Sequence, residues 1–367
     1  MRKKKQNKYQ KAYSYKKDLF TLFLLPIIAT TIGLFFVFEA SSISAFQRFG
    51  TSFYYLKLQT IWFIFGVALM IFFSLFDYHK LYYLSFPLLL INLLLLIIVL
   101  IPGIGHSSGG ARRWIDFGMI SIQPSELVKF SIILYLSSWF LTKERKRFFS
   151  FLFLLGITIT LIILQPDMGS AFIVFGVFLV LYFLSGQELH YLLFLIPISA
   201  GGFFMLIKLS TYRLRRFLAF LNPQEDPLGV TYHINQILIS LSAGGVFGRG
   251  IGASRQKYLF LPEAHTDSIF AIIGEEFGFI GSLALILFYI FLIHRCFLVA
   301  TRAKDRYGTL LAGAIFSLLS LQILVNLGSM VNVIPLTGVP LPFISYGGSS
   351  LLVFFALMGI LINIGKR

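Results

Sequence analysis

The sequence predicts an all-α integral membrane protein that crosses the bilayer about ten times. Two observations support this fold class. Of the 367 residues, 57% are hydrophobic and only 13% are charged, more apolar than a water-soluble domain of this length can bury. Apolar stretches long enough to span the hydrocarbon layer also recur from residue 19 almost to the C-terminus.

The predicted membrane-spanning helices are apolar runs bounded by polar residues, glycine or proline. The first run is too long for the core of a signal peptide and lacks a cleavage pattern after it, so we interpret it as a span. A basic tail at residues 1–18 precedes one membrane domain at 19–364, and residues 365–367 end the chain. The predicted spans lie near residues 19–39, 54–76, 81–101, 125–141, 149–164, 167–184, 190–209, 268–294, 307–330 and 348–364.

The distribution of lysine and arginine orients these helices. Basic residues concentrate before residue 19, at 143–147 and at 295–306. The positive-inside rule therefore places both termini in the cytoplasm and leaves the long loop 210–267, between the seventh and eighth helices, on the outer face. The net charge of +16 arises from such short clusters and not from one soluble basic face, which argues against a nucleic-acid partner.

Part of the long outer loop has the pattern of an amphipathic helix. Within residues 231–242, apolar side chains recur at i, i+3, i+4 and i+7, at Ile234, Ile237, Leu238 and Leu241. Such a helix can lie on the membrane and guide a lipidic substrate, or it can pack on the bundle. The sequence leaves both interpretations open.

Charged residues within or beside the predicted spans are few. Because they are costly in the bilayer, each is a candidate for a polar pathway or a binding site. Glu126 and Lys129 are three residues apart on one helix and share one inward face. An ion pair that only stabilises the bundle is the alternative interpretation. Asp167 and Glu275 lie at or near the ends of later spans.

The outer boundary of the eighth predicted helix carries an acidic motif. Its sequence is Leu261-Pro-Glu-Ala-His-Thr-Asp267, and an apolar helix follows directly. A carboxylate at this boundary can act as a general base, and partial loss of solvent would raise its pKa. A helix-capping role for Asp267 is the alternative, because aspartate is common at helix starts.

A second outer segment combines glycine, arginine and tryptophan. Its sequence, Gly109-Gly-Ala-Arg-Arg-Trp-Ile115, places Arg112 and Arg113 beside Trp114. Arginine forms charge-assisted hydrogen bonds with phosphate, and tryptophan favours the headgroup region. Further arginine and lysine residues lie between residues 213 and 257, in the predicted outer loop. Positive residues are usually more frequent on the cytoplasmic side, so this is an excess. An anionic ligand outside the membrane and attraction to lipid headgroups both explain this excess.

Nucleotide, haem and zinc sites lack support in the sequence. The glycine-rich run 244–252 has neither the Lys-Ser/Thr end nor the preceding strand of a nucleotide loop. The six histidines are scattered without the spacing of metal ligands. The single cysteine, Cys296, excludes an intramolecular disulfide. A divalent cation, Mg²⁺ or Mn²⁺, is compatible with the sequence because it needs few protein ligands.

Five motifs in order resemble the FtsW/RodA family of bacterial cell-wall proteins, also called SEDS proteins. The resemblance covers nearly the whole chain. The motifs are Gly109-Gly-Ala-Arg-Arg-Trp-Ile115, Gln123-Pro-Ser-Glu126, Gln165-Pro-Asp-Met-Gly-Ser170, Leu261-Pro-Glu-Ala-His-Thr-Asp267 with Gly274-Glu-Glu276, and Pro340-Leu-Pro-Phe-Ile-Ser-Tyr-Gly-Gly-Ser349.

The resemblance implies a peptidoglycan glycosyltransferase in the bacterial cytoplasmic membrane. Its substrate would be lipid II, a disaccharide-pentapeptide linked to undecaprenyl pyrophosphate, polymerised at the outer face. The aspartate of the His-Thr-Asp motif is the family's proposed catalytic residue and corresponds to Asp267. We expect an ion pair with Lys129 to keep this carboxyl deprotonated. The predicted substrate-binding residues are Arg112, Arg113, Trp114, Glu126, Lys129, Asp167, His265, Glu275 and Ser345.

Two details resemble the division branch of the family. These are Ala264 and the sequence Glu39-Ala-Ser-Ser42, and they imply septal synthesis with a class B penicillin-binding protein and other divisome proteins as partners. Ser268 and the Tyr232–Gln236 segment depart from the usual family pattern. Three alternatives stay open: an elongation-branch polymerase, a lipid II flippase, and a scaffold for the transpeptidase. The intact motif at Asp267 favours an enzyme.

Overall fold

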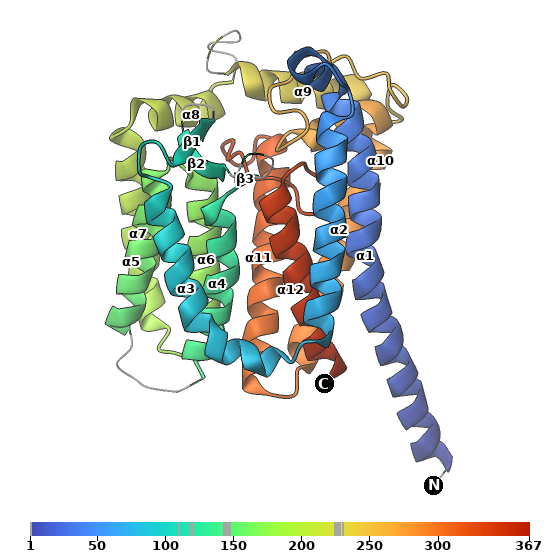
Figure 1. Cartoon of the computed structure of the whole chain (residues 1–367), viewed down its shortest axis with the longest axis vertical. Coiled ribbons are helices and arrows are strands. Elements are labelled where there is room, and N and C mark those ends of the chain that lie inside the picture. The colour runs from blue at the N-terminus through green and yellow to red at the C-terminus, as the bar shows by residue number, and fades with distance from the viewer. Residues whose placement is uncertain are drawn as a thin grey trace.

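The computed structural model describes residues 2–108, 111–116, 118, 121–141, 148–223, 229 and 231–367. Upright helices form a bundle, and shorter helices, a small sheet and loops cover one of its ends (Figure 1). The short 3-10 helix η1 (Tyr78–Lys80) follows the second helix. The upright helices are α1 (Arg2–Phe49), α2 (Tyr54–Leu75), α3 (Leu81–Ile98), α4 (Pro124–Trp139), α5 (Phe148–Leu164), α6 (Met168–Leu184), α7 (His190–Lys208), α10 (Ile269–Arg302), α11 (Arg306–Met330) and α12 (Gly348–Lys366).

The predicted all-α membrane fold with about ten transmembrane helices is confirmed. Within the described residues, six helices are long and apolar enough to cross a bilayer, namely α1, α2, α3, α10, α11 and α12. The shorter apolar helices α5, α6 and α7 and the more polar α4 complete the bundle. Helices α1 and α10 extend well beyond the predicted spans, because their polar ends continue the helix outside the apolar stretch.

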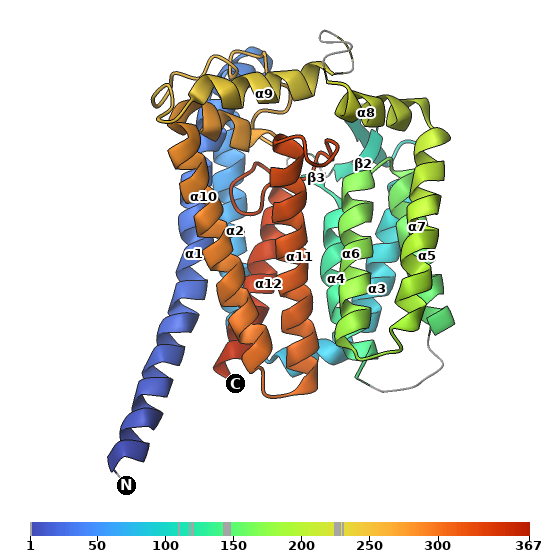
Figure 2. The same ribbon diagram turned by 180° about the vertical axis from the view of Figure 1, so that it is seen from behind.

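Both chain termini lie at the same end of the bundle, and the covered end lies opposite (Figures 1 and 2). The same-end placement is what an even number of spans requires. Residues 2–18, predicted as a tail, are the first turns of α1, which projects past the bundle in both views.

Two helices of the long loop lie across the covered end. They are α8 (Thr211–Leu221) and α9 (Tyr232–Gly244), and α9 confirms the amphipathic helix predicted at 231–242. Ile234 and Ile237 are buried, and the Ser240 hydroxyl donates to the Ala271 carbonyl at 2.9 Å. Helix α9 is therefore anchored on the start of α10.

A three-stranded antiparallel sheet at the covered end was not predicted from the sequence. Its strands, in spatial order, are β1 (Gly105–Ser108), β2 (Ala111–Asp116) and β3 (Ser121–Ile122). The strands are short and lack a clear alternation of polar and apolar residues, so they leave little periodic signal. The sheet fixes the orientation of Trp114, which pairs with His106 across β1 and β2.

The centre of the bundle is α12, whose residues are almost all buried. It packs against α2 through small residues that let the two backbones approach. At Gly359, an added Cβ would stand 2.5 Å from the Met70 carbonyl oxygen. Small residues at helix contacts are a common way to gain packing in a membrane, where lipid removes the hydrophobic drive for association.

The glycine-rich run 244–252 packs directly on a kink in α10. The kink lies at Gly278, which has a φ of +65°. A Cβ added to Gly248 would stand 2.1 Å from the Glu276 carbonyl oxygen, and one on Gly278 would stand 2.3 Å from the Gly248 nitrogen. Close backbone packing therefore explains these glycines.

Candidate functional site

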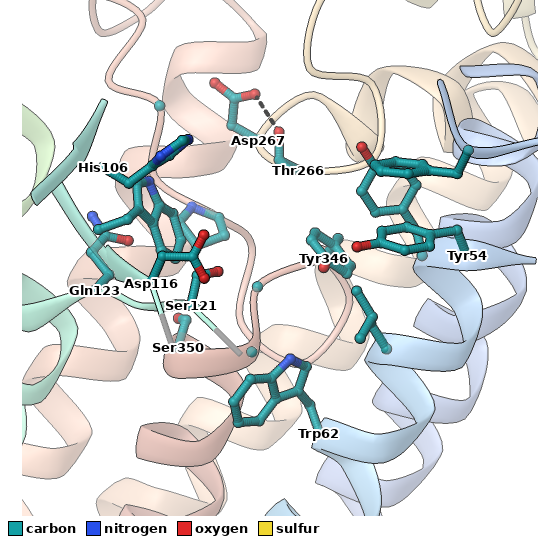
Figure 3. A pocket seen from close by; sticks show the side chains of 18 of the residues that line it. Tyr54, Trp62, His106, Asp116, Ser121, Gln123, Thr266, Asp267, Tyr346 and Ser350 are labelled. Carbon is teal, nitrogen blue, oxygen red and sulfur yellow. Dashed lines mark hydrogen bonds between the residues drawn. The ribbon is translucent and has the colours of Figure 1, made fainter. Parts of the chain in front are cut away.

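An open cavity of about 420 Å³ lies at the covered end of the bundle (Figure 3). It is bounded by the end of α1, by α2, by the sheet and by the segment leading into α12. Figure 3 shows His106, Asp116 and Gln123 on one side of the cavity and Tyr54 and Tyr346 on the other. Its lining residues are Phe49, Tyr54, Tyr55, Leu58, Trp62, His106, Trp114, Asp116, Gly118, Ser121, Gln123, Thr266, Asp267, Gly338, Pro340, Tyr346, Gly347, Gly348 and Ser350.

Asp267 lines this cavity from the turn that leads into α10. Its backbone is fixed by Asn326, whose side-chain amide donates to the Asp267 carbonyl at 2.9 Å and to the Val339 carbonyl at 2.8 Å. The residue is only 6% exposed. The Asp267 carboxylate accepts a long hydrogen bond of 3.3 Å from the Thr266 hydroxyl. The carboxylate is therefore held in place but weakly satisfied.

A neighbouring carboxylate makes ionisation of Asp267 harder. The Thr266 hydroxyl also lies 3.0 Å from Glu263 Oε2, and its one proton cannot serve both acids at once. Burial and the negative charge of Glu263 raise the pKa of Asp267 to about 7, while the positive charge of Arg216 acts in the opposite direction. A base with a pKa near the ambient pH is well suited to accept a proton during catalysis.

His265 lies beside the cavity and is packed among aromatic rings. Its ring centroid is 4.4 Å from that of Tyr55 and 5.5 Å from that of Tyr346. The Tyr346 amide donates to the His265 carbonyl at 2.9 Å, which ties the segment before α12 to the Asp267 motif. Burial lowers the pKa of His265 to about 4, so the ring is neutral at pH 7.

Alternate residues of β2 face opposite ways, as strand geometry requires. Trp114 lines the cavity, whereas Arg113 turns away and donates to the carbonyl of Gln165 at 3.0 Å and to that of Pro166. Arg112 is exposed. Gly109 and Gly110 of the same motif lie outside the described residues. The predicted basic segment is thus divided between two sides of the sheet.

Glu126 and Lys129 form an ion pair inside the bundle, 2.6 Å apart and each 2% exposed. Lys129 also donates to the Gln322 side chain at 2.9 Å. The predicted pairing of Lys129 with Asp267 is therefore wrong, because a nearer carboxylate on its own helix holds the ammonium group. Gln322 in turn donates to the Pro340 carbonyl at 3.1 Å, which connects the pair to the cavity wall.

Asp167 is a fully paired carboxylate at the start of α6. It caps the helix by accepting from the Ser170 amide at 3.0 Å. It also accepts from Ser125 at 3.0 Å and from Gln123 at 3.1 Å. These bonds join α6 to α4, and they orient Gln123, which lines the cavity.

Glu275 and Ser345 each fix a loop, and the loop of Ser345 borders the cavity. Glu275 accepts from the Ser254 hydroxyl at 2.5 Å and from the Arg255 amide at 3.1 Å, which fixes the loop after the glycine run. Ser345 accepts from the Leu341 amide at 2.9 Å. Of the predicted site residues, Asp267 and Trp114 line the cavity, and His265 and Ser345 lie in the segments that form its walls, whereas Glu275 holds a loop that is not part of the lining.

Several cavity residues were not predicted from the sequence. Gln123 belongs to a quoted motif and could have been proposed from it. Tyr346 likewise belongs to the quoted motif at 340–349. Tyr54 and Trp62 gave no signal, because aromatic residues are common throughout the predicted spans. Asn326 is a buried polar residue in the last turns of the apolar helix α11, and such residues in membrane helices usually have a hydrogen-bond partner.

Comparison with known proteins identifies the family of the chain. The profile of the FtsW/RodA/SpoVE family, described as cell cycle protein, matches residues 19–367. The stage V sporulation protein E of Bacillus subtilis is 39% identical over 352 residues, 94% of this chain and 96% of the relative. The probable peptidoglycan glycosyltransferase FtsW of Geobacter metallireducens is 40% identical over 352 residues, 94% of each chain.

A solved structure extends the likeness to three dimensions. That structure concerns the structural coordination of polymerization and crosslinking by a peptidoglycan synthase complex. The matched chain superposes with a TM-score of 0.77 at 28% identity, covering 95% of this chain and 97% of that one. With the family profile and the relatives, this agreement shows that the chain belongs to the FtsW/RodA/SpoVE family of multi-pass membrane proteins.

Proposed function

We propose that the protein is a peptidoglycan glycosyltransferase that polymerises lipid II. The observation that carries the proposal is the weakly satisfied Asp267 carboxylate, with its pKa raised to about 7, in an open cavity of about 420 Å³. The Geobacter relative, a probable peptidoglycan glycosyltransferase, supports it. Relatives named FtsW and a sporulation relative favour septal synthesis over elongation.

In the proposed reaction Asp267 is the general base. The acceptor sugar hydroxyl attacks the anomeric carbon of the donor and forms a new carbon–oxygen bond. The bond between that carbon and the pyrophosphate oxygen breaks, and its electron pair leaves with undecaprenyl pyrophosphate. The hydroxyl proton passes to the Asp267 carboxylate and later to solvent. Asn326 holds the Asp267 backbone at the cavity during this transfer.

The proposal includes a divalent cation bound beside Asp267. Within the described residues no group of three His, Cys, Asp or Glu side chains forms a metal cage. Mg²⁺ and Mn²⁺ can bind through one or two carboxylates and substrate phosphates, and Glu263 and Asp267, which share the Thr266 hydroxyl, fit that smaller set. Such an ion would supply positive charge for the leaving pyrophosphate.

The orientation and partners follow from the same proposal. The cavity lies at the end opposite both termini, so cytoplasmic termini would place it on the outer face of the membrane. A class B penicillin-binding protein is the proposed transpeptidase partner, supported by the complex that couples polymerization to crosslinking. Other divisome proteins would join it at the septum.

The decisive experiment incubates purified full-length protein with lipid II in detergent, alone and with its transpeptidase partner. Detergent removes the bilayer, so transport across a membrane cannot contribute to the signal. We expect glycan polymer from the wild type and none from Asp267→Asn. Absence of polymer under all partner and metal conditions, together with lipid II translocation in vesicles, would favour a flippase instead.

The structure offers less support for a flippase. The charged residues that could form a polar path, Glu126 and Lys129, are buried and bonded to one another. They do not line the described cavity. A transport path through them would need this pair to open.

A further inference from the structure

A second, smaller cavity of about 190 Å³ lies at the covered end, between α6, α7, α8 and the segment 334–337. Most of its lining is apolar and includes Phe172, Phe203 and Phe217. Three arginines, Arg113, Arg213 and Arg216, also line it, and no acidic residue does among its described lining residues. The cavity therefore combines an apolar surface with concentrated positive charge.

The three arginines are positioned by backbone carbonyl groups around the cavity. Arg113 donates to Gln165 at 3.0 Å, and Arg213 donates to the Ile163 carbonyl at 3.2 Å. Arg216 donates to the Leu336 carbonyl at 3.4 Å. These bonds come from the ends of α5 and from the segment before α12, so the guanidinium groups are held by separate parts of the fold.

The two cavities share one wall. Arg113 lines the smaller cavity and Trp114 the larger one, from opposite faces of β2. Thr337 lines the smaller cavity and Gly338 the larger one. Arg216 lines the smaller cavity, and its charge still acts on the Asp267 carboxyl in the larger one. A ligand in one cavity is therefore adjacent to a ligand in the other.

We infer that the arginine cavity binds the pyrophosphate of the lipid-linked donor, with its first prenyl units on the apolar lining, while the acceptor sugar occupies the Asp267 cavity. The inference rests on the proposed polymerase function. Joining two lipid-linked sugars needs a base beside the acceptor and positive charge beside the leaving group. The two cavities supply these opposite requirements on either side of β2.

The charge of the cavity favours a pyrophosphate over an ordinary phospholipid headgroup. A phosphodiester carries one negative charge, whereas a prenyl pyrophosphate carries two or more and offers more acceptor oxygens. Three arginines can form several charge-assisted hydrogen bonds with such a group. The apolar lining matches the adjoining prenyl chain.

Direct binding tests this assignment without relying on turnover. Farnesyl pyrophosphate would be titrated into purified full-length protein in neutral detergent and followed by calorimetry. We expect Arg213→Gln with Arg216→Gln to weaken binding by about tenfold or more. Arg215→Gln is the matched control, since Arg215 lies on α8 but does not line the cavity, and it should bind like the wild type.

Further variants keep the result interpretable. Arg213→Lys with Arg216→Lys retains the charge and should bind more strongly than the glutamine pair, and the unfolding temperature of each variant shows whether it folds. Asp267→Asn should bind farnesyl pyrophosphate normally. Wild-type affinity in folded glutamine variants would overturn the assignment. Displacement of the probe by equal amounts of phosphatidylglycerol would overturn it too and indicate a phospholipid site.

Binding and polymerisation separate the two hypotheses. Arginine-dependent binding without any polymer from the wild type would support the pyrophosphate cavity and count against the polymerase. Polymer formation with arginine-independent binding would support the polymerase and overturn the cavity assignment.

Discussion

Asp167 and Asp267 each lie before a helix and look similar in the sequence. Their surroundings in the structure differ. Asp167 is bonded to Ser170, Ser125 and Gln123 and lies inside the bundle. Asp267 has one long hydrogen bond, a neighbouring acid and an open cavity. The surroundings of Asp167 stabilise an ionised carboxylate, whereas those of Asp267 leave its carboxylate able to accept a proton.

The comparison extends to a third carboxylate. Glu126 is also buried, but Lys129 and its ion pair neutralise it. Of these three carboxylates, two are therefore bonded within the fold and one is placed at the cavity. The kind of partner, more than burial itself, separates the structural acids from the proposed catalytic one. Glu126 is bonded to a cation and Asp167 to three donors, whereas Asp267 accepts a long bond from a hydroxyl that also serves Glu263, although Asp167 and Asp267 are 4% and 6% exposed.

The largest expected effect is on Asp267. Asp267→Asn should lower polymerisation by about 10²- to 10⁴-fold, the usual contribution of a general base. Because the folded state raises the pKa of Asp267, its contribution to stability is complete at low pH and is lost as pH rises through about 7. The variant should therefore be at least as stable as the wild type at pH 8, as thermal unfolding can show. Retained activity would contradict the assignment.

Breaking the buried ion pair should cost stability. Lys129→Met leaves Glu126 charged and unpaired in an apolar interior, and we expect a loss of about 3–5 kcal/mol in the free energy of unfolding. Adding Glu126→Gln removes that charge and should restore most of the loss. Thermal unfolding in detergent compares the single and double variants. Equal destabilisation of both would show that the pair does not act through its charge.

The paired aspartate should show a smaller and different effect. Asp167→Asn keeps the shape but weakens the cap and the bonds to α4, with an expected loss of about 1–2 kcal/mol. Polymerisation per folded molecule should change little. If instead its turnover fell as far as that of Asp267→Asn, at unchanged stability, Asp167 would belong to the catalytic machinery.

The smallest expected effect concerns pH. Polymerisation should decline as pH falls below about 7, because protonated Asp267 cannot accept a proton. Glu263→Gln removes the neighbouring negative charge that raises this pKa, so the acidic limb of the rate profile should move to lower pH by up to about one unit. Measured rates from pH 5 to 9 test the shift, and Glu263→Asp, which keeps the charge, is the control.

The sequence predicted the helical fold and the catalytic candidate well, because long apolar runs and a polar motif at a span boundary leave clear local signals. Helix α9 was also predicted, from the helical spacing of its apolar side chains. The partner of Lys129 was predicted wrongly, since the choice between Glu126 and Asp267 depends on packing. The short sheet and the aromatic cavity wall arise from contacts between distant segments, which a local pattern does not record.

The wall contributed by residues 338–350 has a consequence for biosynthesis. These residues follow the Asp267 motif in the chain, and they close the cavity around Asp267 and bond to His265 through Tyr346. A chain arrested before α12 would carry the base but no enclosed site, and it should bind substrate weakly and form no polymer. The site is therefore complete only once α12 has inserted, and chains in the membrane that lack α12 should form no polymer.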